Sequence, residues 1–96
     1  MTVLEACVRA SGMRRGGLTA SFVAQWAITA AELGHVPTTV EYGEWWYIDE
    51  RTGWRHRAAI RDVFGDNWQE VIEMVAADIK RRRLRSPRDV MRLAVV

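Results

Sequence analysis

The sequence contains a single cysteine, Cys7, and only two prolines among its 96 residues. One cysteine excludes a disulfide within the chain and any site that needs two thiolates from the same chain. No apolar run approaches the roughly 18 residues of a membrane-spanning helix, so we expect no membrane partner. The first residues lack the basic stretch and apolar run of a secretory signal, and we therefore expect a cytoplasmic protein.

The motifs of the common catalytic and cofactor sites are missing too. The sequence has no Gly-rich phosphate loop, no H-E-x-x-H, no Cys–His metal spacing and no G-x-S-x-G. The acid pair Glu70 and Glu73 falls on an amphipathic helical pattern, where it is expected to face solvent. We therefore expect no enzyme, no metal site and no cofactor.

What is present is typical of one small helical domain spanning residues 1–96. Hydrophobic residues make up 49% of the chain and charged residues 27%, which suits a single core. The only alternating stretch, residues 40–42, is too short to predict a strand. We expect an all-α fold of five to six short helices, at about residues 2–12, 20–33, 38–47, 50–64 and 66–83, with a last one from 86.

Two of these helices have an N-terminal capping box, in which a short polar side chain is followed three residues later by Glu or Gln. Thr38 with Glu41 predicts one helix start, and Asp66 with Gln69 predicts another. Gly65, between the fourth and fifth predicted helices, is expected to end the fourth in a left-handed conformation.

Five tryptophans are many for so short a chain. Trp26, Trp46 and Trp68 lie on the apolar stripes of three predicted helices and are expected to form one aromatic core. Trp45 is adjacent to Trp46 on a helix, about 100° away around the axis, so the two cannot face the same core. Trp45 and Trp54 therefore remain as candidate contact residues.

The charges are unevenly distributed although the net charge is only +2. Residues 51–61 carry four Arg and no acid, residues 62–78 carry five acids and no base, and residues 80–92 carry one Lys and six Arg against one acid. Arg forms bidentate contacts with phosphate and guanine. A genome rich in GC codons would also favour Arg, so the bias alone decides little.

Residues 38–60 match the requirements of two helices packed across a tight turn. Such a unit needs a small residue where the first helix meets the second, and Gly43 supplies it. It also needs apolar residues around the turn and a cap for the second helix, and these are Tyr42, Trp46, Ile48 and Asp49.

This stretch resembles the helix-turn-helix of bacterial and phage DNA-binding proteins. A longer string resembles small helix-turn-helix proteins of actinobacteria and their phages, through Pro37, Trp45-Trp46, Arg51-Thr52, Arg55 and Phe64-Gly65. The resemblance covers about residues 36–66 and implies a second helix that lies in the major groove of double-stranded DNA. It does not specify the regulated gene or the sequence bound.

Three positions depart from that pattern. The turn position that is usually Gly is Tyr47, and a left-handed conformation costs a bulky residue on the order of 1 kcal/mol. The buried position of the second helix is Gly53, where Val or Ala is usual. The next inward position is His56, where an aliphatic residue is usual, and we expect it to be a hydrogen-bonded core histidine.

Helix geometry divides the second helix of this motif, from about residue 50 to 64, into two faces. The inward face is expected to hold Gly53, His56, Ile60, Val63 and Phe64, and the outward face Glu50, Arg51, Trp54, Arg55, Ala58 and Arg61. The resemblance assigns base contacts to the start of this helix, so we expect Arg51 and Arg55, with the adjacent Thr52, to contact base edges.

The remaining candidate contacts surround these residues. Arg57 and Arg61 are expected to reach phosphates at the groove edge, and Thr38 and Thr39, at a helix N-terminus, also suit a phosphate. Trp54 would contact a sugar, a thymine methyl or a protein partner, and the sequence does not separate these alternatives.

The leading hypothesis is a transcriptional regulator of phage or mobile-element type that binds DNA as a homodimer on a two-fold site. One alternative is a protein-interaction module that binds a host protein through exposed tryptophans. Another is an accessory protein of DNA packaging or recombination, which would form rings or filaments. The basic run 81–85 is open to three interpretations: a solvated helix end, a second phosphate contact, or an oligomer interface that also includes the apolar residues after it.

Overall fold

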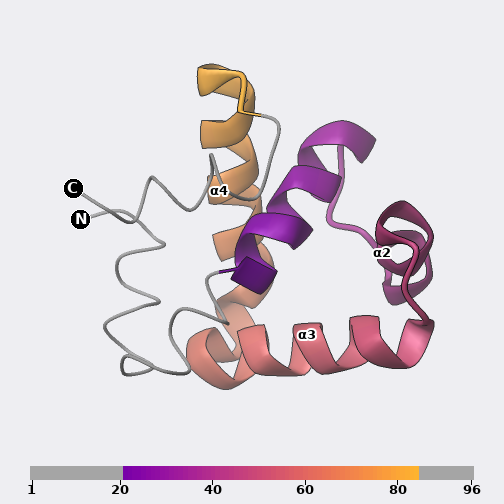
Figure 1. The fold of residues 1–96 in the computed structure, drawn as a ribbon. Coiled ribbons are helices and arrows are strands. Elements are labelled where there is room, and N and C mark those ends of the chain that lie inside the picture. Colours follow the sequence, from indigo (N-terminus) through magenta and orange to yellow (C-terminus); the bar gives the residue numbers. More distant parts are fainter. Residues whose placement is uncertain (1–20, 85–96) are drawn as a thin grey trace.

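A computed structural model of the chain describes residues 21–84, and helices make up most of this range. The chain is helical over residues 21–33 and then forms α2 (Thr39–Trp46), α3 (Glu50–Phe64), the single 3-10 turn η1 (Gly65–Asn67) and α4 (Trp68–Arg82) (Figure 1). No strand occurs in this range, so the all-α prediction is confirmed for it. The helices expected before residue 20 and after residue 85 lie outside the described residues, and the predicted total of five to six remains a prediction.

The predicted start of α2 is confirmed in atomic detail. The amide of Glu41 donates to Thr38 Oγ1 at 3.2 Å, and the amide of Thr38 donates to Glu41 Oε1 at 3.0 Å. Asp49 caps α3 in the same manner, accepting the amide of Thr52 at 2.7 Å. These caps satisfy amides that have no partner within the helix, and so they fix where each helix begins.

The predicted start of the last described helix is wrong. Asp66 and Gln69 do not form a capping box, because residues 65–67 form η1 and the helix begins at Trp68 without a side-chain cap. Gly65 has a positive φ of 64°, but its ψ of −141° is not that of a left-handed helical residue. The tight 3-10 turn brings the chain round so that the Trp68 side chain is buried at the first residue of α4.

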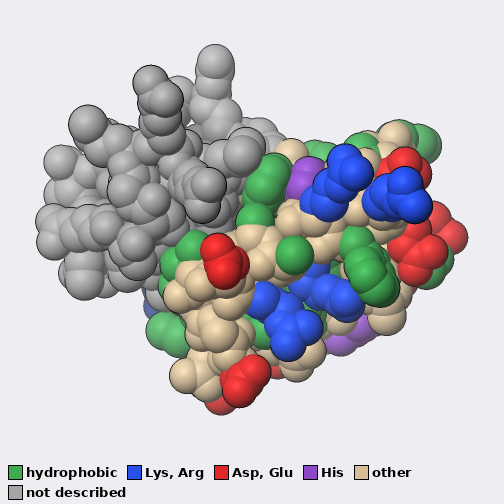
Figure 2. All heavy atoms as spheres, turned by 90° about the horizontal axis from the view of Figure 1, so that it is seen from below, with side chains coloured by type: hydrophobic (Ala, Val, Ile, Leu, Met, Phe, Trp, Pro, Cys, Tyr) green, Lys and Arg blue, Asp and Glu red, His purple; other side chains and the backbone are tan. Residues whose placement is uncertain are grey.

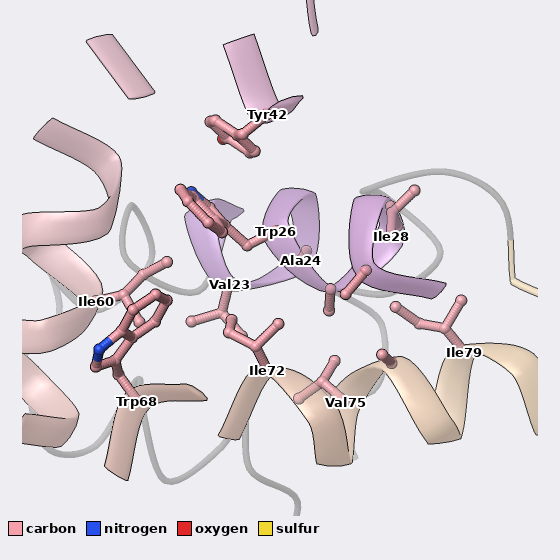
Figure 3. Packing of buried hydrophobic residues seen from close by; sticks show 13 residues of the cluster. Val23, Ala24, Trp26, Ile28, Tyr42, Ile60, Trp68, Ile72, Val75 and Ile79 are labelled. Carbon is pink, nitrogen blue, oxygen red and sulfur yellow. The ribbon is translucent and has the colours of Figure 1, made fainter. Parts of the chain in front are cut away.

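The core lies mainly between helix 21–33 and α4, and α2 and α3 each add one large buried side chain. Figure 3 shows Val23 of helix 21–33 pointing toward Ile72 of α4, whereas Trp26 points toward Tyr42 of α2. The members of this core are Val23, Ala24, Trp26, Ala27, Ile28, Ala30, Tyr42, Ile60, Trp68, Ile72, Val75, Ala76 and Ile79. Within residues 21–84, no helix is long and apolar enough to cross a bilayer.

An aromatic group forms one end of this core. The rings of Trp26 and Tyr42 stack with centroids 4.4 Å apart, and Trp68 meets Trp26 edge to face at 5.8 Å. Trp46 packs against the core but is only half-buried, and its Nε1 donates to Thr29 Oγ1 at 2.8 Å. The predicted three-tryptophan core is therefore confirmed for Trp26 and Trp68, whereas Trp46 lies at its margin.

Candidate nucleic-acid interface

Three residues, 47–49, join α2 to α3 in a tight turn. Tyr47 is left-handed, with φ 55° and ψ 43°, as its position in the motif predicts. The amide of Ile48 donates to the carbonyl of Gly43 at 3.0 Å, which closes the turn against the end of α2. A Cβ at Gly43 would lie 2.9 Å from the Ile48 carbonyl oxygen, so the small residue is required by the turn itself.

The contact between α2 and α3 depends on the second glycine, Gly53. It is buried on the inward face of α3, where the Tyr42 ring packs against it. A Cβ built there would lie 3.3 Å from Tyr42 Cδ1 and 3.4 Å from the Thr39 carbonyl oxygen. The absence of a side chain at Gly53 therefore allows α3 to pack closely against α2 and its large aromatic residue.

His56, the next inward residue of α3, is half-buried and satisfied. Its Nδ1 lies 2.8 Å from the Tyr42 hydroxyl, and its ring stacks on Phe22 with centroids 3.8 Å apart. The Tyr42 hydroxyl also donates to Gln25 Oε1 at 2.7 Å. Burial lowers the pKa of His56 and raises that of Tyr42, so the network favours neutral forms of both. The prediction of a hydrogen-bonded histidine on the inward face is confirmed, but His56 lies at the margin of the core and not within it.

The outward face of α3 is exposed and basic, as the periodicity predicts. Arg51 and Arg55 lie one turn apart at its start, and Ala58 and Arg61 continue the exposed surface toward its end. Figure 2 looks onto this side of the molecule and shows basic side chains on either side of exposed hydrophobic ones, with acidic side chains toward the edges. The structure therefore places the two predicted base-contacting arginines on one accessible surface.

Trp54 lies between two pairs of arginines around α3, Arg51 with Arg55 on one side and Arg57 with Arg61 on the other. Its side chain is 59% exposed, and the Arg57 guanidinium is 5.6 Å from the centroid of its ring. This is the geometry of a cation–π contact, and Arg57 is itself half-buried. Trp45, which is 42% exposed, lies on α2 and not on this face of α3.

The arginines of α3 have no carboxylate partner among the described residues. Within residues 21–84, the Glu41 carboxylate contacts His35 and the Asp78 carboxylate pairs with Arg81, and no ion pair involves an arginine of α3. Hydrogen bonds from Thr52 lower the pKa of the Asp49 carboxyl, and the nearby Arg51 and Arg55 add to this effect. A hollow of about 270 Å³, lined by Glu50, Arg51 and Trp54, lies beside the start of the helix.

The predicted phosphate contact at Thr38 and Thr39 is not supported by their surroundings. The Thr39 side chain is 7% exposed, and its hydroxyl donates to Glu50 Oε1 at 3.3 Å. The Thr38 hydroxyl and amide are both used in the capping box, which places the Glu41 carboxylate at the end of α2 where a phosphate would bind. Both threonines therefore hold the motif together. Thr52 is half-buried, and its amide is used by the cap of α3.

One polar contact near α2 was missed by the sequence analysis. His35 Nε2 lies 3.0 Å from Glu41 Oε2, and this contact joins the loop before α2 to its first turn. The amide of Thr38 and the contact with His35 both lower the pKa of the Glu41 carboxyl. No sequence pattern signals a pair six residues apart across a loop.

Comparison of the chain with protein families, with curated proteins and with solved structures finds no match. Within residues 21–84, no group of three or more His, Cys, Asp or Glu side chains could hold a metal ion. The function of the basic surface must therefore be argued from the residues of this chain alone.

Proposed function

We propose that this protein binds double-stranded DNA, with the outward face of α3 in the major groove. The observation that carries the proposal is the pair Arg51 and Arg55, exposed one turn apart and unpaired with any carboxylate of the described residues. Each guanidinium can donate two hydrogen bonds to O6 and N7 of a guanine. Buried contacts of α2 fix the helix that carries them, which suits a surface that must keep its register on a duplex.

The contacts around this pair would position the protein on the duplex. Arg61 would reach a phosphate at the groove edge, and Arg57 would do so from its position beside Trp54. Such phosphate contacts fix the register of the protein on the duplex but carry no sequence information. The exposed Trp54 would contact a sugar or a thymine methyl between the two arginine pairs. Thr38 and Thr39 are left out of the proposed interface, since their polar groups are already used.

The proposed role is that of a non-catalytic transcriptional regulator in the cytoplasm, of phage or mobile-element type. A single motif offers few base contacts, so a homodimer on a two-fold site is part of the proposal. Measurement of the mass in solution, with and without a selected site, tests this part.

Selection of bound sequences from a random pool of duplexes is the first test, followed by affinity measurements on the enriched site. Replacement of Arg55 by Ala should weaken specific binding by about 1–3 kcal/mol, or roughly 5- to 150-fold. Arg81→Ala is the matched control, because it also removes one exposed arginine. Arg81 lies at the end of α4 that is remote from α3 and already pairs with Asp78, so its loss should leave the affinity for the enriched site unchanged. Equal affinities of Arg55→Ala and wild type on the enriched site would refute the proposal.

A protein-binding role is the second candidate, favoured by the exposure of Trp45 and Trp54. Large exposed aromatic side chains are typical of interface centres. The two functions differ in their salt dependence, because release of counterions makes DNA binding fall steeply with salt. Binding to a host protein that survives high salt and is lost in Trp54→Ala would favour this second function.

A further inference from the structure

All the lysines and arginines of residues 21–84 lie in two separate groups. The first is on α3, and the second is the α4 terminal cluster, which we define as Lys80, Arg82 and Arg83; Arg81 lies between them in sequence but pairs with Asp78 and is not counted in the cluster. Residues 62–79 between them contain five acids and no Lys or Arg, and residues 21–50 contain no Lys or Arg either. This part of the molecule therefore has two basic surfaces separated along the chain by an acidic stretch.

The two groups lie at opposite ends of α4. The 15 residues of this helix span about 22 Å at 1.5 Å per residue. Figure 1 shows α4 running away from α3, so that its last turn lies at the end of the molecule remote from α3. Charges in water interact little beyond the Debye length of about 8 Å at physiological salt. A phosphate bound at one group therefore gains little from the charges of the other.

Three side chains of the α4 terminal cluster are available to a ligand. Lys80, Arg82 and Arg83 are exposed, and none of them pairs with a carboxylate of residues 21–84. Arg81 differs, because its guanidinium contacts Asp78 one turn earlier. Favourable interaction with the helix dipole accounts for positive charge at this end, but not for a density of four basic residues in succession.

We propose that the α4 terminal cluster binds the phosphate backbone of a second DNA duplex, so that one protein molecule bridges two duplexes. The inference rests on the proposed DNA binding by α3. Arg guanidinium groups suit the bidentate contact that phosphates accept. An anionic membrane is disfavoured, because surface-binding helices place large apolar side chains beside the basic ones. The one large exposed apolar residue of α4 is Met74, six positions before Lys80.

A two-duplex capture assay tests this inference. One duplex is fixed to beads, the protein is added, and the amount of a second, fluorescent duplex that the beads retain is measured. Wild type should retain the second duplex, and the variant K80Q/R82Q/R83Q should retain at least tenfold less while it still binds the fixed duplex through α3. The single substitutions Arg82→Gln and Arg81→Gln form a matched pair on the same turn. Arg82→Gln should reduce retention more, because Arg81 is engaged by Asp78.

The salt dependence gives an independent readout. Each phosphate contact contributes a slope of about −0.9 in a plot of log affinity against log salt. The variant R51Q/R55Q/R57Q/R61Q, which removes every arginine of α3, should therefore keep single-duplex binding with a slope of up to about −2.7 from the three available side chains of the cluster. Adding K80Q/R82Q/R83Q to R51Q/R55Q/R57Q/R61Q should abolish that binding. Restoring charge with Lys at positions 82 and 83 should recover most of it. Circular dichroism of each variant establishes that it is folded.

The outcomes separate this inference from the proposal for α3. Retention of the second duplex by K80Q/R82Q/R83Q at the wild-type level would overturn the bridging site, since the bridge would then come from self-association. Failure of wild type to retain a second duplex would overturn it as well. Cluster-dependent binding to vesicles of phosphatidylserine and phosphatidylcholine, without binding to DNA, would assign the site to a membrane instead. Single-duplex binding that is unchanged in R51Q/R55Q but lost in K80Q/R82Q/R83Q would refute the proposal for α3 and leave the cluster as the DNA site.

Discussion

The backbone of Tyr47 is expected to be strained, so replacing Tyr47 by glycine should raise the free energy of unfolding. Its backbone is left-handed, at φ 55° and ψ 43°, and its side chain is 96% exposed. A side chain in this conformation costs roughly 1–2 kcal/mol because Cβ lies too close to the following carbonyl oxygen. An exposed ring gains almost no burial energy to offset that cost. The structure therefore shows strain at Tyr47 without a compensating contact among the described residues.

The expected change in the free energy of unfolding follows from two opposing terms. Tyr47→Gly removes the strain of about 1–2 kcal/mol. It also makes the unfolded chain more flexible, which costs about 0.4–1 kcal/mol. The net expectation is a stabilisation of roughly 0.5–1 kcal/mol, equivalent to a rise in Tm of about 2–8 °C for a domain of this size. Tyr47→Ala keeps Cβ and removes only the exposed ring, so it should leave the stability unchanged within about 0.5 kcal/mol.

Urea unfolding of the three proteins, followed by circular dichroism, measures these differences. Tyr47→Asn provides a further comparison, since Asn adopts the left-handed conformation more readily than Tyr and stays less flexible than Gly when unfolded. If Tyr47→Gly lowers the stability by 1 kcal/mol or more while Tyr47→Ala is neutral, the strain argument is wrong. If both substitutions destabilise, the ring makes a contact that its exposure does not reveal.

Three further predictions concern the contact between α2 and α3. Gly43→Ala should lower the urea midpoint, because the new Cβ would lie 2.9 Å from a backbone oxygen of the turn, which outweighs a gain in helix propensity of about 1 kcal/mol. Gly53→Ala should be less destabilising than Gly43→Ala, since its closest contact is with the Tyr42 ring at 3.3 Å; the reverse order would contradict this account of the turn. Burial lowers the pKa of His56, so below about pH 6.5 the unfolded state binds a proton that the folded state resists. Stability should therefore fall as the pH drops below 6.5 toward the folded-state pKa, and His56→Gln should flatten that part of a stability profile measured between pH 5 and 8.

Features determined by neighbouring residues could be predicted from the sequence. The starts of α2 and α3 each depend on a polar side chain and an amide three residues later, and both were identified correctly. The two faces of α3 follow from a period of 3.6 residues, so the exposure of Arg51 and Arg55 was predictable as well. The same reasoning failed after Gly65, where Asp66 and Gln69 have the right spacing for a cap. Instead, α4 starts at Trp68, which is buried against Trp26, 42 residues earlier in the chain.

Contacts between distant segments could not be predicted in this way. The stacking of Arg57 on Trp54 depends on side-chain conformation, and the pairing of His35 with Glu41 depends on the path of a loop. The engagement of Thr39 by Glu50 needs the packing of α2 against α3, which spacing alone does not supply. This last contact changes the candidate interface, because it removes a residue that the sequence assigned to DNA.

Gly53 and His56, two of the three departures from the usual helix-turn-helix pattern, are both explained by the large side chain of Tyr42. A large aromatic residue on α2 needs space on α3, and Gly53 provides it by having no side chain. The hydroxyl of that residue must be satisfied when it is buried, and His56 and Gln25 provide the partners. Without Tyr42, Gly53 and His56 would each weaken the contact between α2 and α3. With Tyr42 present, Gly53 makes room for the ring and His56 contacts its hydroxyl. The inward face of α3 is thus held by packing and hydrogen bonds together, which leaves its outward arginines on a helix whose position is fixed from behind.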